Sequence, residues 1–406
     1  METTTNKFTG YQAFIVAIIA ILQFTIVLDF MVLSPLGAIL MPELKIGPSE
    51  FGLVVSAYAF SAGASGLLAA GFADKFDRKK LLLFFYTGFI IGTLFCALAP
   101  TYQLLMAARV VTGLFGGVIG SISLAIITDI FAMQLRGRVM GFVQMAFGVS
   151  QVLGIPIGLW LANNYGWHSP FMLIVIFSIL VGVVLLIFMK PINEHLKIKS
   201  DKNAFLHLWH TVSNTDYLKG FLGTVLLATG GFMLMPFSSA FSTFNLKIPM
   251  DQLPLLYGVT GVFTMVAGPL MGKLSDKIGK YKVFLIGTII SMVMVIIYTQ
   301  LGVTPLWMLI VVNVILFIGI TSRIISASAL MTAVPAPQDR GAYMSINSSI
   351  QQLSGGVASG IAGLIVVQTP SGVLDHFDTL GYVVFVSMIA AAAFMYVVNK
   401  MVMGRK

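Results

Sequence analysis

Long apolar segments alternate with short polar ones along the whole chain. Each segment reaches or exceeds the roughly 20 residues that an α-helix needs to cross a bilayer. Charged residues, glycine and proline separate them. The pattern predicts an all-α membrane protein with twelve transmembrane helices, at 11–40, 51–73, 81–99, 103–129, 138–163, 169–190, 219–245, 252–274, 283–301, 306–333, 341–367 and 380–399.

One long polar connection divides the chain almost in half. It predicts an N-terminal six-helix bundle at 1–190, a linker with an interfacial helix at 191–218, and a C-terminal six-helix bundle at 219–406. The halves repeat: AIITDIFAMQLRG from Ala125 is followed 204 positions later by ALMTAVPAPQDRG. Parallel repeats of this kind indicate two bundles related by an axis along the membrane normal, with substrate bound between them.

Composition and charge support a membrane protein and define its orientation. Only 10% of the residues are charged, against about 25% in a soluble domain. Twenty of the 24 Lys and Arg residues lie on the side of the bilayer that carries both termini, so both termini are expected in the cytoplasm. We expect a multi-pass monomer in the inner cell membrane. The net charge of +9 comes from short clusters between apolar segments, which does not indicate nucleic-acid binding.

Three charged residues lie in the interior of the predicted spans, away from their ends: Asp29, Arg109 and Arg323. An unpaired charge there costs at least about 2.5–3.5 kcal/mol, so each needs a partner or an aqueous cavity. Asp29 is the one acid clearly within the hydrocarbon region, which makes it the candidate partner of Arg109. Arg323 has no acid at matching depth in its half, so it is expected to attract an anionic substrate, to cap carbonyl groups, or to face the inner mouth.

The loops between the second and third helix of each half carry a recognisable motif. AGFADKFDRKK from Ala70 and GKLSDKIGKYK from Gly272 resemble the pattern G-x-L-a-D-r-x-G-r-k of the major facilitator superfamily, although the first copy has Ala70 and Asp77 where glycines are usual. The resemblance implies gating contacts on the inner side, with the alternative that these residues are a solvated basic cluster. The residues concerned are Asp74, Arg78, Asp129, Asp276, Lys280 and Arg340.

Two further motifs resemble the drug:proton antiporter branch of this family, which includes sugar-efflux-type exporters. Arg109 and Gly113 match R-x-x-x-G in the fourth helix. The fifth helix has a glycine and proline run like the antiporter motif, in which small residues allow close helix packing and proline bends the helix. Its members are Gly148, Gly154, Pro156 and Gly158.

The resemblance implies that Asp29 and Arg109 couple transport to protons. Burial disfavours a charged carboxylate and a nearby guanidinium favours it, so a movable Arg109 would let Asp29 bind and release a proton. A static structural pair is the alternative. Substrate-cavity candidates are polar or flexible side chains on apolar spans, although the aromatic and methionine members are equally expected in plain packing. These are Gln144, Gln151, Arg323, Asn347, Gln351, Phe232, Met235 and Phe237.

The leading functional hypothesis is a proton-coupled antiporter that exports small organic molecules, including drugs, by alternating access. An uptake symporter or uniporter for a sugar or metabolite is the main alternative. A membrane sensor or intramembrane enzyme is remote, because the sequence has no Walker loop, H-E-x-x-H motif or paired-carboxylate site. We expect no enzymatic activity, metal or cofactor, with a proton gradient as the energy source and protons, lipid and a small molecule as partners.

Overall fold

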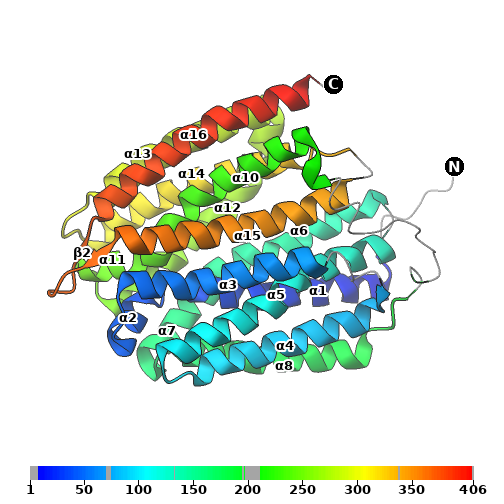
Figure 1. Cartoon of the computed structure of the whole chain (residues 1–406), viewed down its shortest axis with the longest axis horizontal. Helices are drawn as coiled ribbons and strands as arrows, with labels where there is room; N and C mark the ends of the chain where they lie inside the picture. The colour runs from blue at the N-terminus through cyan, green and yellow to red at the C-terminus, as the bar shows by residue number, and fades with distance from the viewer. Residues whose placement is uncertain are drawn as a thin grey trace.

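The computed structural model describes residues 8–69, 75–131, 133–193, 196, 211–336 and 339–404. Long helices run side by side from one end of the molecule to the other (Figure 1). Eleven helices among the described residues are long and apolar enough to cross a membrane. A further one, α15 (Arg340–Ile365), has the length but is more polar. These helices confirm the predicted fold class.

The helices of the first half follow the predicted spans closely. Its first span is divided into two helices and its fifth into three. The elements are α1 (Gly10–Val32), α2 (Gly37–Leu44), α3 (Pro48–Ala69), α4 (Arg78–Leu98), α5 (Tyr102–Ile130), α6 (Met133–Val149), η2 (Ser150–Gly154), α7 (Ile155–Tyr165) and α8 (Ser169–Phe188).

The second half repeats this plan, and its first span is also broken. The elements are α10 (Thr215–Leu234), η4 (Met235–Phe237), α11 (Ser238–Phe244), η5 (Met250–Gln252), α12 (Leu253–Ile278), α13 (Lys280–Thr299), α14 (Leu306–Met331), α15 and α16 (Phe377–Met403). Most of the predicted interfacial helix lies outside the described residues.

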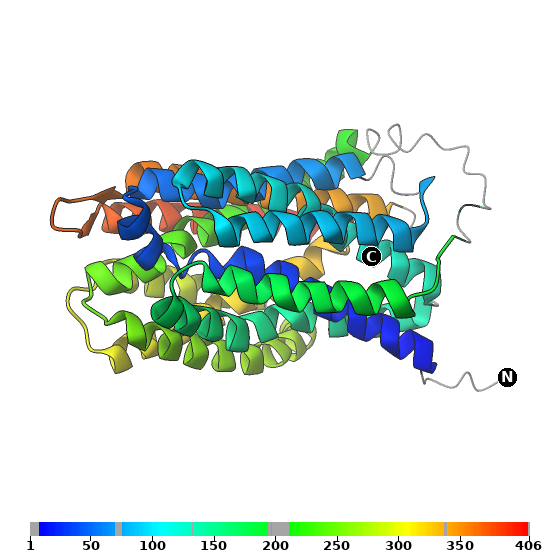
Figure 2. The same cartoon turned by 90° about the horizontal axis from the view of Figure 1, so that it is seen from below.

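The two ends of the molecule differ in their connections. α1 begins and α16 ends at the same end, called here the termini end (Figures 1 and 2). At the other end, the hairpin end, β1 (Val367–Gln368) pairs antiparallel with β2 (Leu374–Asp375). This short hairpin was not predicted, because two-residue strands leave no periodic pattern in a sequence.

Prolines break the first span of each half. The prediction of one continuous helix over 11–40 is wrong: α1 ends at Val32 and a turn precedes α2. Pro35 explains the break, since proline cannot donate the helical hydrogen bond and clashes with the preceding turn. Pro236 lies in the 3-10 turn at the corresponding place. The two breaks meet, because the Ser239 hydroxyl donates to the Ser34 carbonyl at 3.1 Å.

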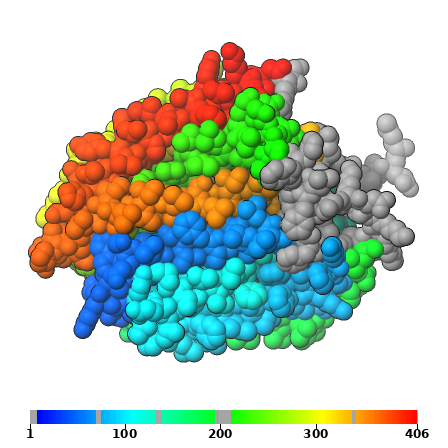
Figure 3. Space-filling view, in the orientation of Figure 1, coloured from blue at the N-terminus to red at the C-terminus, as the bar shows by residue number. Residues whose placement is uncertain are grey.

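The two halves pack tightly where α3 meets α15, which lie edge to edge in Figure 3. A Cβ added at Gly52 would lie 2.9 Å from the Ser359 carbonyl oxygen, and one at Gly63 would lie 2.7 Å from Leu353. The Ser56 hydroxyl also donates to the carbonyl of Gly356 at 2.7 Å. Small residues therefore let the two backbones approach closely, as at other membrane helix interfaces.

A second contact between the halves joins the broken fifth span to α12. A Cβ added at Gly261 would lie 3.0 Å from the Gln151 carbonyl oxygen in the π-helical turn η2. Pro156 follows this turn and packs against Gly258. The π-turn is explained by Pro156, which removes one backbone donor and forces the local hydrogen bonding to change.

Candidate functional site

Asp29 and Arg109 form an ion pair inside the first half. Nη1 of Arg109 lies 2.8 Å from Oδ2 of Asp29, and both residues are fully buried. The same nitrogen lies 3.4 Å from the Asp29 backbone carbonyl oxygen. The pair joins α1 to α5, and it brings Arg109 together with the acid that the sequence analysis named as its candidate partner.

Two further helices complete the surroundings of the pair. Thr93 on α4 donates to Oδ1 of Asp29 at 3.2 Å, and the Arg109 guanidinium lies 4.6 Å from the ring centre of Tyr58 on α3. Gly113 makes this stacking possible, because a Cβ there would lie 2.0 Å from the Ser61 hydroxyl and 2.5 Å from the Tyr58 carbonyl oxygen. The R-x-x-x-G pattern thus brings α5 against α3 one turn from the arginine.

The contact between the two charges uses only one guanidinium nitrogen. Among the described residues, Nε and Nη2 of Arg109 have no hydrogen-bond partner although they are buried. Arginine forms its strongest contacts with carboxylates through two parallel hydrogen bonds. A pair joined through one nitrogen is easier to separate, and the unused donors remain available to a shifted Asp29.

The antiporter-motif residues pack around the helix that carries Asp29. A Cβ at Gly154 would lie 2.5 Å from Leu28, and one at Gly158 would lie 2.7 Å from Val32. Gly148 is looser, with Met265 of the other half 3.9 Å from its Cβ position. The fifth span therefore holds α1 on both sides of Asp29 along the chain.

The gating-loop candidates are only partly brought together. Nε of Arg78 lies 3.0 Å from Oδ2 of Asp129, which joins the start of α4 to the end of α5. Asp276 is exposed and Lys280 half-buried in the second half. Asp74 and the side chain of Arg340 lie outside the part of the chain that the structure describes.

Other polar contacts at the termini end were not predicted. The Arg136 guanidinium donates to the carbonyl oxygens of Phe131 and Thr128, which caps the end of α5. In the second half the Tyr217 hydroxyl donates to Oδ2 of Asp339 at 2.7 Å and accepts a hydrogen bond from a backbone amide. Single arginines and tyrosines near helix ends are too common to indicate such contacts from sequence.

The substrate-cavity candidates have different environments. Phe237 is fully buried, and its ring centre lies 6.1 Å from that of Phe51. Phe232 and Met235 are half-buried, as is Gln151. Phe237 is therefore inaccessible in this state, whereas the others retain accessible surface. The side chain of Gln144 lies outside the part of the chain that the structure describes.

Asn347 and Gln351 lie four residues apart on α15 but have different environments. Asn347 is buried and accepts a hydrogen bond from Thr224 of α10 at 2.5 Å. Gln351 is exposed, as is Ser348. Helical geometry places these two exposed polar side chains opposite the exposed apolar Val357, on the face that points between the halves. Gln351 and Ser348 are thus better placed than Asn347 to meet a solute.

Arg323 is buried in the second half, away from any carboxylate among the described residues. It is 3% exposed, and its Nε and Nη2 have no hydrogen-bond partner in the described part of the chain. Its guanidinium carbon lies 5.9 Å from the ring centre of Phe284, near the start of α13 at the termini end. A substrate contact at Arg323 therefore requires a different state of the bundle.

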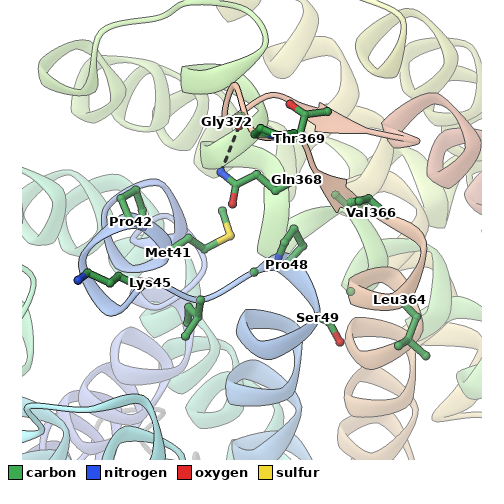
Figure 4. Close-up of a pocket in the computed structure, with 15 residues that line it drawn as sticks. Met41, Pro42, Lys45, Pro48, Ser49, Leu364, Val366, Gln368, Thr369 and Gly372 are labelled. Atoms are coloured by element: carbon green, nitrogen blue, oxygen red, sulfur yellow. Dashed lines mark hydrogen bonds between the residues drawn. The ribbon is translucent and has the colours of Figure 1, made fainter.

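A groove of about 750 Å³ opens at the hairpin end, where the halves meet (Figure 4). Met41, Pro42 and Lys45 of the first half form one wall, and Leu364 and Gln368 of the second half form the other. Gln368 donates to the Gly372 carbonyl at 3.1 Å, which holds the hairpin in shape. The groove is separated from Asp29 by the tightly packed contacts between the halves.

The geometry, two similar halves with a buried ion pair inside the first, agrees with comparisons to known proteins. The profile of the Major Facilitator Superfamily matches residues 19–218 and 220–404. The "Uncharacterized MFS-type transporter YceJ" of Bacillus subtilis is 25% identical over 360 residues, which cover 88% of this chain and 89% of that protein. "Multidrug resistance protein 3" of the same organism is 27% identical over 202 residues, 50% of this chain and 39% of that protein.

A solved structure shows the same fold at low sequence identity. The "D-xylose-proton symporter" superposes with a TM-score of 0.80 at 17% identity, covering 95% of this chain and 98% of that one. The profile covers nearly the whole chain, and the relatives that match over most of its length are named as transporters. The chain therefore belongs to the Major Facilitator Superfamily and is a membrane transporter, not an enzyme.

Proposed function

We propose that this transporter exchanges protons for small organic molecules and exports the latter by alternating access. The observation that carries the proposal is the fully buried Asp29 carboxylate, held by a single nitrogen of Arg109. An ionisable group inside a membrane is expensive to keep and is typically part of an ion pathway. Protonation of Asp29 would remove its charge and leave Arg109 free to move.

Export is supported by the fifth span and by one group of relatives. Gly154 and Gly158 resemble the antiporter motif and pack beside Asp29. "Multidrug resistance protein 3" matches half of the chain. Since the basic clusters lie at the termini end, we place that end in the cytoplasm of a cell with an inner membrane. Export then carries substrate from the termini end to the hairpin end.

Transport in a closed membrane tests this proposal. Cells overproducing the protein are screened for growth protection against antibiotics, dyes and sugar analogues, and the best-protected compound is taken into proteoliposomes with an imposed pH gradient. We expect the compound to move against the direction of the protons. Movement in the same direction as the protons would contradict export and would support the alternative, proton-driven uptake.

The Asp29→Asn variant tests the proton site itself. We expect it to lose pH-driven flux while remaining folded, because asparagine keeps the shape of the side chain but cannot release a proton. Asp251→Asn is the matched control, since Asp251 is exposed in the short 3-10 helix η5 and the variant should transport normally. Full pH-driven flux by Asp29→Asn would exclude Asp29 as the coupling site.

A further inference from the structure

Two phenylalanines from equivalent positions meet between the halves. Phe30 of α1 and Phe232 of α10 are 202 residues apart, the spacing that also relates Lys45 to Lys247 at the ends of their broken spans. The ring centres of Phe30 and Phe232 lie 5.9 Å apart at 50°. Both rings are half-buried, so each keeps accessible surface although it lies inside the bundle.

Beyond this aromatic pair, the path toward the hairpin end is closed. α1 and α10 both run toward that end, and the residues that directly follow the pair, 31–36 and 233–234, are buried. Ser239 is fully buried and donates to the Ser34 carbonyl, and the rings of Phe51 and Phe237 are in contact. The aromatic pair is thus the innermost layer of the closure.

Each ring of the pair is supported by its own half. A Cβ at Gly355 would lie 2.9 Å from ring carbons of Phe232, so only glycine lets the ring lie against α15. On the other side, the Phe30 ring centre lies 5.3 Å from that of Tyr58. Tyr58 also carries the Arg109 guanidinium at 4.6 Å. One tyrosine ring therefore contacts both the ion pair and the aromatic pair.

We propose that Phe30 and Phe232 close the transport path toward the hairpin end, and that the Tyr58 ring couples this closure to the charge on Asp29. The proposal rests on the proposed proton-coupled function, which it deepens by naming the positioning residue. Protonation of Asp29 removes the counter-ion of Arg109. The guanidinium then shifts against Tyr58, whose ring can no longer support Phe30 in the closed position.

A buried serine offers a reporter that leaves all of these residues intact. Ser239→Cys is nearly isosteric and places a thiol inside the closure, where a reagent reaches it only when the closure opens. The native Cys96 is fully buried, so the unmodified protein gives the background. The rate of modification by a charged methanethiosulfonate is measured on purified transporter in lipid nanodiscs, with total thiol determined after denaturation to confirm equal amounts of protein.

The first arm tests the aromatic pair. We expect Phe30→Ala and Phe232→Ala each to increase the modification rate of Ser239→Cys at least about fivefold. Phe60→Ala is the matched control, since Phe60 contacts α15 from α3 but lies outside the pair and is 41% exposed. Rates for the first two variants that are no higher than the rate for Phe60→Ala would overturn the assignment of the closure.

The second arm tests the coupling through Tyr58. We expect Asp29→Asn to increase the modification rate at least about threefold. We expect the same increase when Asp29→Asn is combined with Tyr58→Phe, which keeps the ring. In a protein that carries Tyr58→Ala, Asp29→Asn should no longer alter the modification rate, because the ring that couples Asp29 to Phe30 is absent. The effects of substitutions that act through one shared contact are non-additive. An undiminished effect in Tyr58→Ala would overturn the coupling.

The labelling needs no substrate and no pH gradient, so its result is independent of the transport test. If Asp29→Asn and Tyr58→Ala have non-additive effects on the modification rate but the protein shows no pH-driven flux, the coupled closure is retained and proton-coupled export is rejected. Normal pH-driven flux that requires Asp29, together with additive labelling, would retain the proposed function and reject the role of Tyr58.

Discussion

The two halves have the same helical plan but differ in the charge they hold inside. In the first half Arg109 pairs with Asp29. The residue 204 positions after Arg109 is Asn313, whose amide donates to the Leu309 carbonyl of its own helix at 3.1 Å. The residue 202 positions after Asp29 is Gly231. The first half thus holds a buried ion pair where the second half has neutral residues at the corresponding positions.

Arg323 sharpens this comparison, because it is an interior cation with no carboxylate beside it among the residues that the structure describes. It lies ten residues beyond Asn313 on α14, about 15 Å further toward the termini end at 1.5 Å per residue. Arg109 and Arg323 both leave Nε and Nη2 unpartnered within the described residues. Only Arg109 contacts an acid there. Removing the positive charge of each arginine should therefore have opposite effects on the stability of the protein.

The largest expected effect is on stability when each arginine is replaced by methionine. Arg109→Met leaves Asp29 buried without a counter-ion, which should cost about 3–5 kcal/mol. Arg323→Met removes a buried cation that has no acid partner in the described part of the chain, and it keeps a long apolar side chain, so stability should be unchanged or increased. Thermal unfolding of the purified variants in detergent measures both.

The double variant Asp29→Asn with Arg109→Met is the control for this contrast. It removes both charges and should recover most of the lost stability. An equal loss of stability in Arg109→Met and Arg323→Met would show that the stability of the first half does not depend on its ion pair. If Arg323 also binds substrate, Arg323→Met should reduce transport of anionic compounds and leave that of neutral ones unchanged.

Much of the fold could be predicted from sequence because membrane crossing imposes a strong pattern. Apolar length locates the spans, and the charge distribution identifies the two ends. The break after Val32 was missed, since a proline within a long apolar segment can either bend a helix or end it. The outcome depends on the neighbouring half, here on the contact between Ser34 and Ser239.

The charged residues of the candidate site could be predicted from sequence, but the residues that contact them could not. Asp29 and Arg109 stand out because charges are rare in apolar spans. Thr93 and Tyr58, which complete the site, have residue types that occur throughout such helices. Their roles follow from the crossing of α4 and α3 with α5, which is a property of packing.

Gly113 provides a smaller test, specific to the first half. A Cβ there would meet the Tyr58 backbone, so Gly113→Ala should force α5 away from α3 and cost about 1–3 kcal/mol. Gly120→Ala on the same helix is the matched control, since nothing lies within 4 Å of its Cβ position. In the second half the corresponding residue is Phe317, so this glycine position is specific to the first half. Equal unfolding temperatures for the two variants would contradict the packing argument.

The smallest expected effect concerns the ion pair at the termini end. Arg78 and Asp129 are 5% and 24% exposed, and a pair in contact with solvent contributes about 0.2–1 kcal/mol. A double-mutant cycle with Arg78→Gln and Asp129→Asn isolates this contribution from the other contacts of each residue. The second half has Lys280 and Ala333 at the corresponding positions, so the position that matches Asp129 carries no acid. Lys280→Gln should therefore leave stability unchanged. A loss of stability as large as that of Arg78→Gln would mean that the basic residue stabilises the corresponding loop in both halves.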